Sequence, residues 1–164
     1  MSECIIFAPH ADDEIIGCFS LLQSGKVNEI LFGSSLSLYE CDSSKLNKDF
    51  NIKTSTAYVT NEGVPMYDVK KYKEYTLLFP DPIYETHPYH KVWGAFGLIL
   101  FQRGYDVIFY STNMNAPYIQ EVKNWKEKKQ ALDRYYIEKS DLWKYDYKYF
   151  LFEGYTKWIR TWED

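Results

Sequence analysis

The chain has three histidines, and all of them fall in two short segments that also contain groups able to bind a metal ion or move a proton. Residues 9–14 read Pro-His-Ala-Asp-Asp-Glu, and residues 87–90 read His-Pro-Tyr-His. Catalytic zinc sites use three ligands drawn from His and Asp or Glu, and leave a fourth position for water. His10 and Asp13 could supply two of these ligands, and His90 could supply the third. The residue types therefore predict one catalytic metal centre.

The remaining polar residues of the two segments suggest how such a centre would react. A divalent metal lowers the pKa of bound water from ~15.7 to about 7, which makes hydroxide available at neutral pH. Asp12, beside the ligand turn, is the candidate general base that takes a proton from water and passes it to a leaving amine. His87 could steady a developing oxyanion without binding the metal. We expect amide hydrolysis.

The first segment must lie in a turn between a strand and a helix. Residues 4–8 form an apolar run typical of a buried parallel strand, and apolar residues then recur at helical spacing over 15–22, as far as Gly25. Such turns at the carboxyl ends of strands are where open α/β sheets bind ligands. A glycine-rich phosphate loop is the rival use of this turn, but residues 9–14 contain neither glycine nor lysine.

The rest of the chain continues the alternation of strands and helices. We expect a strand over 29–34, a helix over 90–102 closed by Gly104, and a buried strand over 105–111. This order predicts an α/β fold, with a Rossmann-like, mostly parallel sheet flanked by helices in a single compact domain over residues 1–164.

Other segments carry weaker structural predictions. The strand-like runs 56–60 and 75–79 predict a hairpin or an extension at the edge of the sheet. The alternation of aromatic and charged residues over 145–149 predicts a strand with one aromatic face. Trp158 and Trp162 are spaced like one face of a terminal helix. Packing in a core or a dimer contact explains the aromatic residues more readily than stacking on a sugar.

Together, the two segments resemble those of a known family. Pro-His-x-Asp-Asp-Glu after a first strand, followed by His-Pro-x-His before a helix, is similar to the pattern of the zinc-dependent de-N-acetylases of the LmbE-like group, which includes the PIG-L deacetylase of N-acetylglucosaminyl-phosphatidylinositol. The resemblance implies that His10, Asp13 and His90 bind zinc. It also implies that Asp12 is the general base and that His87 assists the tetrahedral intermediate.

The same resemblance suggests a substrate and extends further along the chain. It implies removal of acetyl from an N-acetylated amino sugar or glycoconjugate of the N-acetylglucosamine type. Residues 128–136 followed by 152–153 resemble the closing helix and strand of the family. Asn113, Asn115 and Tyr118 follow the strand over 105–111, and we consider them candidates for contacts with a sugar.

Two departures from the family pattern leave alternatives open. Ala11 replaces the usual second proline, and Tyr89 replaces an aspartate that could orient a ligand imidazole. Residues 36–80 contain no arginine, although longer members carry arginine-bearing helices there. A non-catalytic sugar-binding or scaffolding module on the same fold is therefore the alternative function. Iron(II) is the alternative metal, because it also suits two histidines and one carboxylate.

Composition limits the partners and the compartment. A net charge of -4, with 46% hydrophobic and 26% charged residues, is typical of a globular domain with no general attraction to nucleic acid or anionic lipid. We expect no membrane span and no secretory signal, and hence a cytoplasmic protein. Cys4, Cys18 and Cys41 are expected to be reduced structural thiols, and the basic run 123–134 a solvated helix face. No oligomeric state is predicted.

The residue usage of the chain bears on the substrate. Lys, Asn, Ile and Tyr are frequent and arginine is sparse, which suits an AT-rich genome such as that of a phage or a low-GC bacterium. A sugar carried on modified nucleic acid or on a cell envelope would then be a candidate substrate, although the net charge does not indicate nucleic-acid binding.

Overall fold

A seven-stranded sheet forms the centre of the protein, which is seen in a computed structural model that describes residues 3–33, 43–60, 65–66, 68–136 and 146–156. Five strands run parallel: β1 (Cys4–Ala8), β2 (Val27–Phe32), β3 (Lys53–Thr56), β6 (Thr76–Pro80) and β7 (Asp106–Ser111). The last two are antiparallel to their neighbours: β9 (Phe152–Tyr155), which pairs with β7, and β8 (Tyr118–Glu121), which pairs with β9. The order across the sheet is β3-β2-β1-β6-β7-β9-β8.

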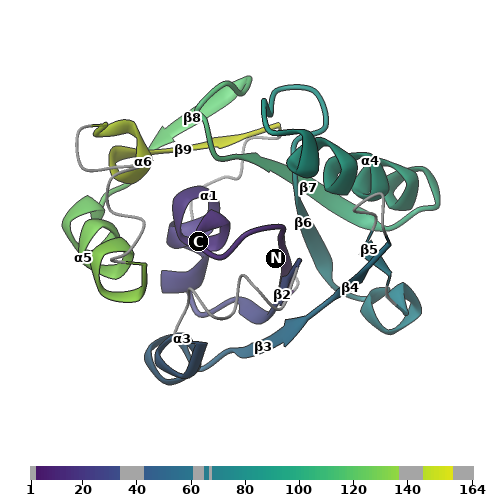
Figure 1. Ribbon diagram of the computed structural model, residues 1–164, viewed down its shortest axis with the longest axis horizontal. Coiled ribbons are helices and arrows are strands. Elements are labelled where there is room, and N and C mark those ends of the chain that lie inside the picture. The colour runs from purple at the N-terminus through teal and green to yellow at the C-terminus, as the bar shows by residue number, and fades with distance from the viewer. Residues whose placement is uncertain (1–2, 34–42, 61–64, 67, 137–145, 157–164) are drawn as a thin grey trace.

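Helices cover both faces of this sheet (Figure 1). The described helices are α1 (Asp13–Gln23), α3 (Ser43–Phe50), α4 (Pro88–Gln102), α5 (Trp125–Tyr135), α6 (Lys148–Leu151) and a short 3-10 helix (Val69–Tyr72). A separate two-stranded ribbon pairs β4 (Tyr58–Val59) with β5 (Pro65–Met66). Helix α4 packs on β6 and β7 from one side, and α1 packs on β1 from the other side with α5 next to it.

The core has two halves because β1 is buried on both faces. Cys4, Ile6 and Ala8 belong to a cluster with the apolar residues of α1, α5 and α6, whereas Ile5 and Phe7 belong to a cluster with those of α4 and the 3-10 helix. Alternate residues of a strand point to opposite faces, so a strand between two layers of helices must be apolar throughout. This is why the N-terminal strand is an unbroken apolar run.

The chain reverses its direction of travel across the sheet at β1. From β1 the chain passes through α1 to β2 and then β3 on one side, and it later returns to β6 on the other side of β1. Ligands of open α/β sheets bind at such a reversal, outside the carboxyl ends of the strands. The turn after β1 and the loop after β6 therefore border the same crevice. The prediction of a Rossmann-like, mostly parallel α/β sheet flanked by helices is confirmed.

Two predictions about local structure are wrong. Most of the run 75–79 lies in β6, a central strand rather than part of a hairpin or an edge. The five residues of β6, Thr76–Pro80, are all buried, and the strand lies between β1 and β7. The segment around Tyr147 and Tyr149 forms the helical turn α6 rather than a strand. Asp146 favours this turn, since its carboxylate accepts a hydrogen bond from the backbone N–H of Lys148 at 3.2 Å.

Other predictions are settled only in part. The run 56–60 divides between the end of β3, which is an edge strand, and the ribbon strand β4. The prediction that the basic run 123–134 forms a solvated helix face is wrong for Lys128, because this residue is fully buried. Cys4 and Cys18 are buried thiols, as expected. Tyr145, Cys41, Trp158 and Trp162 lie outside the described residues. Within the described part of the chain, no helix is long and apolar enough to cross a membrane.

Candidate metal centre

The turn between β1 and α1 folds the Asp13 carboxylate back onto His10. Asp13 is the first residue of α1, and its Oδ2 atom accepts a hydrogen bond from the backbone N–H of His10 at 2.8 Å. The backbone N–H of Asp13 in turn points at the carbonyl oxygen of His10, 3.3 Å away. These reciprocal bonds fix the carboxylate, which is only 3% exposed. The sequence spacing of the two residues thus places two donor groups side by side.

Asp12 caps α1 with a strained backbone. Its φ angle is 122°, a conformation that L residues rarely adopt and that costs on the order of 1–3 kcal/mol. The buried Glu14 holds it there, because Oε2 of Glu14 accepts the Asp12 backbone N–H at 3.0 Å while Tyr136 donates to Oε1. Burial raises the pKa of Glu14 to about 7, although these two hydrogen bonds oppose the rise. Strain of this kind is characteristic of functional sites.

The loop after β6 and the start of α4 supply the other two histidines. His87 is the N-cap of α4, followed by Pro88 at the first helical position, and its Nδ1 accepts the backbone N–H of Tyr89 at 3.2 Å. A neutral imidazole that accepts at Nδ1 carries its proton on Nε2. Burial is the largest of the causes that lower the pKa of His87, and the charges of the neighbouring His10 and His90 lower it further. This histidine is therefore a neutral donor at the rim of the site.

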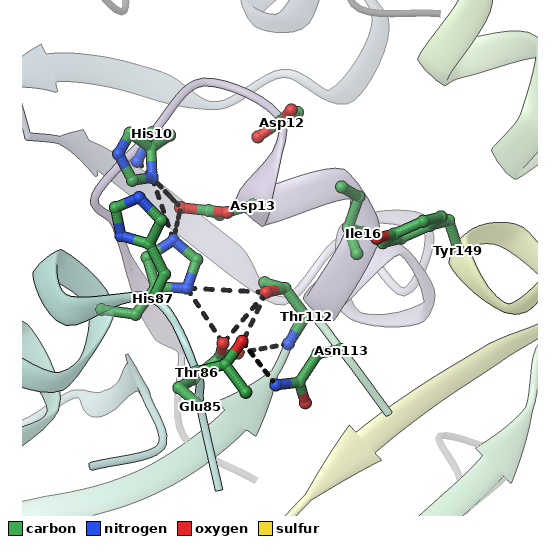
Figure 2. A pocket seen from close by; sticks show the side chains of 11 residues that line it. His10, Asp12, Asp13, Ile16, Glu85, Thr86, His87, Thr112, Asn113 and Tyr149 are labelled. Carbon is green, nitrogen blue, oxygen red and sulfur yellow. Dashed lines mark hydrogen bonds and ion pairs between the residues drawn. The ribbon is translucent and has the colours of Figure 1, made fainter. Parts of the chain in front are cut away.

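His10, Asp13 and His90 bring three donor atoms into one small triangle. Figure 2 shows the His10 and Asp13 side chains of this triangle. His90 Nε2 lies 2.9 Å from His10 Nδ1 and 3.1 Å from Asp13 Oδ2, and the remaining side of the triangle is 3.5 Å. A tetrahedral zinc ion with bonds of about 2.0–2.1 Å separates its ligand atoms by roughly 3.3 Å. The three atoms therefore already stand at the spacing that zinc requires, and the residues fit the metal.

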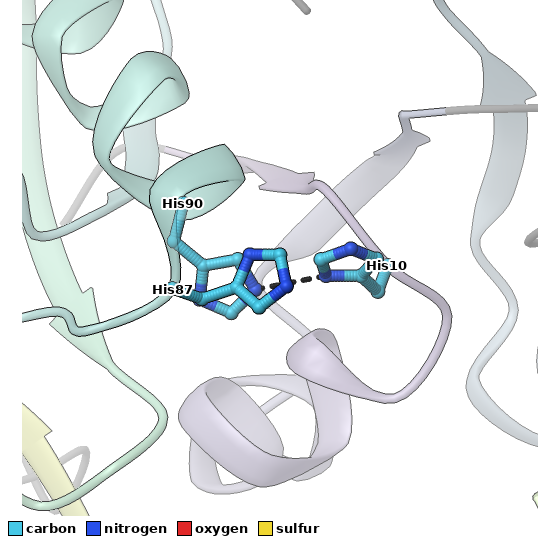
Figure 3. Close-up of side chains that lie close together, drawn as sticks. All are labelled: His10, His87 and His90. Carbon is cyan, nitrogen blue, oxygen red and sulfur yellow. Dashed lines mark hydrogen bonds between the residues drawn. The ribbon is translucent and has the colours of Figure 1, made fainter.

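His87 lies next to this triangle on its exposed side. Figure 3 shows its ring facing those of His10 and His90, and one ligand atom from each of the three histidines lies within 4.8 Å of the others. Since His87 is exposed whereas His90 is buried, the solvent side of the site carries the His87 imidazole. It is placed to reach a group held at the triangle without belonging to it.

Glu85 fixes the orientation of His90 from behind. Its Oε2 lies 3.1 Å from Nδ1 of His90, and its Oε1 accepts hydrogen bonds from the backbone N–H and, at 3.0 Å, the hydroxyl of Thr112. A carboxylate on the second nitrogen of a ligand histidine fixes its tautomer and raises its basicity. The sequence analysis missed both Glu85 and Thr112. The one available signal was an acidic residue shortly before the His-Pro-Tyr-His segment.

The buried carboxylates of Asp13 and Glu85 and the imidazole of His90 stabilise one another's charges. Burial by itself would lower the pKa of His90, but the Asp13 and Glu85 carboxylates outweigh it and raise the pKa to about 10. Burial would likewise raise the pKa of Asp13, but His90 and His10 hold it below its usual value. The two carboxylates thus favour an imidazolium between them. A metal ion bound at Nε2 would take the place of that proton.

A pocket of about 340 Å³ opens over the triangle. It is lined by His10, Asp12, Asp13, Ile16, Glu85, Thr86, His87, His90, Thr112, Asn113 and Tyr149. Its volume is at the low end of the ~300–1,000 Å³ typical of ligand sites, which suits a small ligand or the end of a larger one. Among the described residues that line it, carboxylates are present and lysine and arginine are not.

The five residues singled out from the sequence all line this pocket. His10, Asp12, Asp13, His87 and His90 come together from the turn after β1 and from the loop after β6.

The residues named as candidate sugar contacts have separate outcomes. Asn113 lines the pocket, held by hydrogen bonds from its Nδ2 to the carbonyl oxygen of Tyr84 at 3.2 Å and to Thr86. Asn115 and Tyr118 are exposed outside the lining. Tyr89 lies with its ring centroid 5.3 Å from that of His10.

Comparisons with known proteins establish the fold alone. No protein-family model matches the chain, and no curated protein matches it in sequence. The structure is similar to the crystal structure of the conserved protein TT1542 from Thermus thermophilus, with a TM-score of 0.62 and 13% sequence identity. The match covers 97% of this chain and 96% of that protein. The protein is thus an α/β protein of this Rossmann-like architecture.

Glu85→Gln is expected to weaken zinc binding by about 10–100-fold, because the amide cannot polarise the His90 imidazole as the carboxylate does. Isothermal titration of the metal-free protein with Zn²⁺ measures the loss. Glu74→Gln, an exposed residue away from the pocket, is the matched control and should bind like the parent. Parent-like affinity of Glu85→Gln would contradict the role given to this carboxylate.

Metal affinity is expected to rise with pH. The metal must displace the proton on His90, so acid favours the metal-free form, and the association constant should increase by up to about tenfold per pH unit near neutrality. Competition with a chromophoric chelator at several pH values, corrected for the chelator's own protonation, gives the slope. A constant that stays flat or falls with pH would contradict the proton exchange.

Proposed function

We propose that the protein is a zinc-dependent hydrolase that removes the acetyl group from an N-acetylated amino sugar or glycoconjugate, as a short member of the LmbE-like de-N-acetylases. The observation that carries this proposal is the triangle of His10 Nδ1, Asp13 Oδ2 and His90 Nε2, with sides of 2.9, 3.1 and 3.5 Å. Three such donors and an open pocket are the composition of a catalytic zinc site. Fe²⁺ is the alternative metal for the same ligands.

The residues around the triangle supply the remaining steps of amide hydrolysis. His10, Asp13 and His90 would hold the zinc ion, which would supply polarisation of the acetyl carbonyl and a lowered pKa of water. The Asp12 carboxylate takes one proton from the attacking water as its oxygen adds to the carbonyl carbon, and then gives that proton to the nitrogen as the C–N bond breaks. The Nε2–H of His87 donates to the carbonyl oxygen while that oxygen carries negative charge. Acetate and a free amine are the products.

The pocket favours an uncharged substrate near the reacting bond. Asp12, Asp13 and Glu85 line it, and no lysine or arginine does so among the described residues. A phosphate group placed here would meet no lysine or arginine among these lining residues to offset the carboxylates. We therefore propose a neutral N-acetylhexosamine unit, free or at the end of a conjugate, in a phage or bacterial sugar-modification reaction in the cytoplasm. The domain proposed for this activity covers residues 1–164.

A sugar-binding or scaffolding module without turnover is the second candidate, and Tyr89 favours it. The Nδ1 atom of His87 accepts a backbone N–H here and has no carboxylate partner among the described residues. A neutral imidazole can donate a hydrogen bond but has no proton to give away readily. This candidate requires binding of acetylated sugar with no release of acetate over time, whereas the hydrolase requires steady release.

Asp12→Asn is the test of the proposed chemistry. Asparagine tolerates positive φ better than most residues, so the fold and the metal should be retained, while loss of the base should lower acetate release by about 10²–10⁴-fold. Metal content by elemental analysis and acetate release from a panel of neutral N-acetylhexosamines measure the two effects. Asp133→Asn, on the surface of α5, is the matched control. An Asp12→Asn variant that keeps its metal and full acetate release would rule out Asp12 as the base.

A further inference from the structure

Helix α1, which carries Asp13, is broken one turn into its length. Cys18 has φ −137° and ψ 21°, which are not helical values, although the residues on both sides belong to the helix. In a regular helix the backbone N–H of Ser20 would donate to the carbonyl oxygen of Ile16. Here that N–H donates to Oε1 of Glu153 at 3.0 Å, and the Ile16 carbonyl oxygen accepts from Nζ of Lys128 at 2.6 Å. Each group has a side-chain partner from another element.

These two side chains form an ion pair that is completely removed from solvent. Lys128 comes from α5 and Glu153 from β9, both are 0% exposed, and Nζ lies 3.4 Å from Oε1. Lys128 also donates to the Phe152 carbonyl oxygen at 3.2 Å, and Glu153 accepts from the Tyr155 hydroxyl at 3.0 Å. Buried ion pairs contribute little net stability, because desolvation costs roughly as much as the attraction returns. Their use is more often to fix one arrangement.

The residues of α1 that line the pocket lie before the break. Asp13 and Ile16 line the pocket, and Ile16 also belongs to the core cluster that Leu21 and Leu22 join after the break. Between them, Gly17 lies so close to β7 that an added Cβ would meet the Tyr110 ring at 2.4 Å. The first turn is therefore held against the sheet at Gly17. The Lys128 ammonium group holds the same turn at the carbonyl oxygen of Ile16, one residue nearer to Asp13.

We propose that the buried Lys128–Glu153 pair is a positioning device for the metal centre, which holds the first turn of α1 so that the Asp13 carboxylate completes the triangle with His10 and His90. This inference rests on the metal site of the proposed function. Metal bonds tolerate errors of about 0.2 Å, so a small rotation of the first turn would remove Asp13 from the coordination sphere. The pair acts through Asp13 and does not itself touch metal or substrate.

Co²⁺ is the probe, because its visible absorption reports coordination geometry as well as occupancy. Lys128→Met removes the donor to Ile16 and should weaken Co²⁺ binding by about tenfold or more, with a changed visible spectrum. Glu153→Gln keeps the shape and the acceptor for Ser20 but removes the charge, and should weaken binding by about threefold or more. Circular dichroism melts establish that each variant is folded.

Tyr72→Phe is the matched control. It removes a buried hydrogen bond to Glu29, of 3.0 Å, in the cluster on the other face of the sheet, so it costs stability without touching α1. Its Co²⁺ affinity should stay within about twofold of the parent, with the same spectrum. If the Lys128–Glu153 pair served only general stability, the folded Lys128→Met and Glu153→Gln variants would keep the Co²⁺ affinity and the spectrum of the parent.

The outcomes are separable. Folded pair variants with parent-like affinity and spectrum would overturn the inference, and if Lys128→Met does not melt cooperatively, Glu153→Gln alone decides. A parent that binds no Co²⁺ would overturn the metal site, and with it both the proposed function and this inference. Weakened binding with an altered spectrum in the pair variants, beside an unchanged Tyr72→Phe, is the result that we expect.

Discussion

The contact between Asp13 and His90 is the interaction on which the rest of the site depends. It joins the turn after β1 to the helix after β6 across the point where the strand order reverses, with Oδ2 and Nε2 3.1 Å apart. Both residues are at most 5% exposed, so neither charge would be tolerated there without a partner. His10 contacts Asp13 and Glu85 contacts His90, and the same four groups can exchange a proton for a metal ion.

Much of the fold and of the site could be predicted from local sequence. The two histidine segments each fall within one turn, and an apolar strand before the first segment places it at a ligand-binding edge of an α/β sheet. The rest depends on contacts between distant residues. Glu85 meets His90 only through the fold of its loop, Lys128 is buried because it pairs with Glu153, and β6 is central because helices cover both of its faces. No local pattern distinguishes these residues from ordinary charged or apolar ones.

The surroundings of the triangle bear on chemistry as much as the triangle does. The backbone of Asp12 is held at φ 122° by a hydrogen bond to the buried Glu14, and Asp12 lines the pocket. His87 presents an Nε2–H because the Tyr89 backbone occupies Nδ1. The proposed base, donor and metal ligands thus all line one small pocket, as the proposed hydrolysis requires.

The most direct test of the central claim is the metal content of the protein. Elemental analysis of the untagged parent, purified beside an identically prepared His90→Ala variant, compares the occupied site with one that lacks the ligand joining its two halves. We expect about one zinc per chain in the parent and little in the variant. Equal metal content in both proteins, or none in the parent after dialysis against zinc, would contradict it.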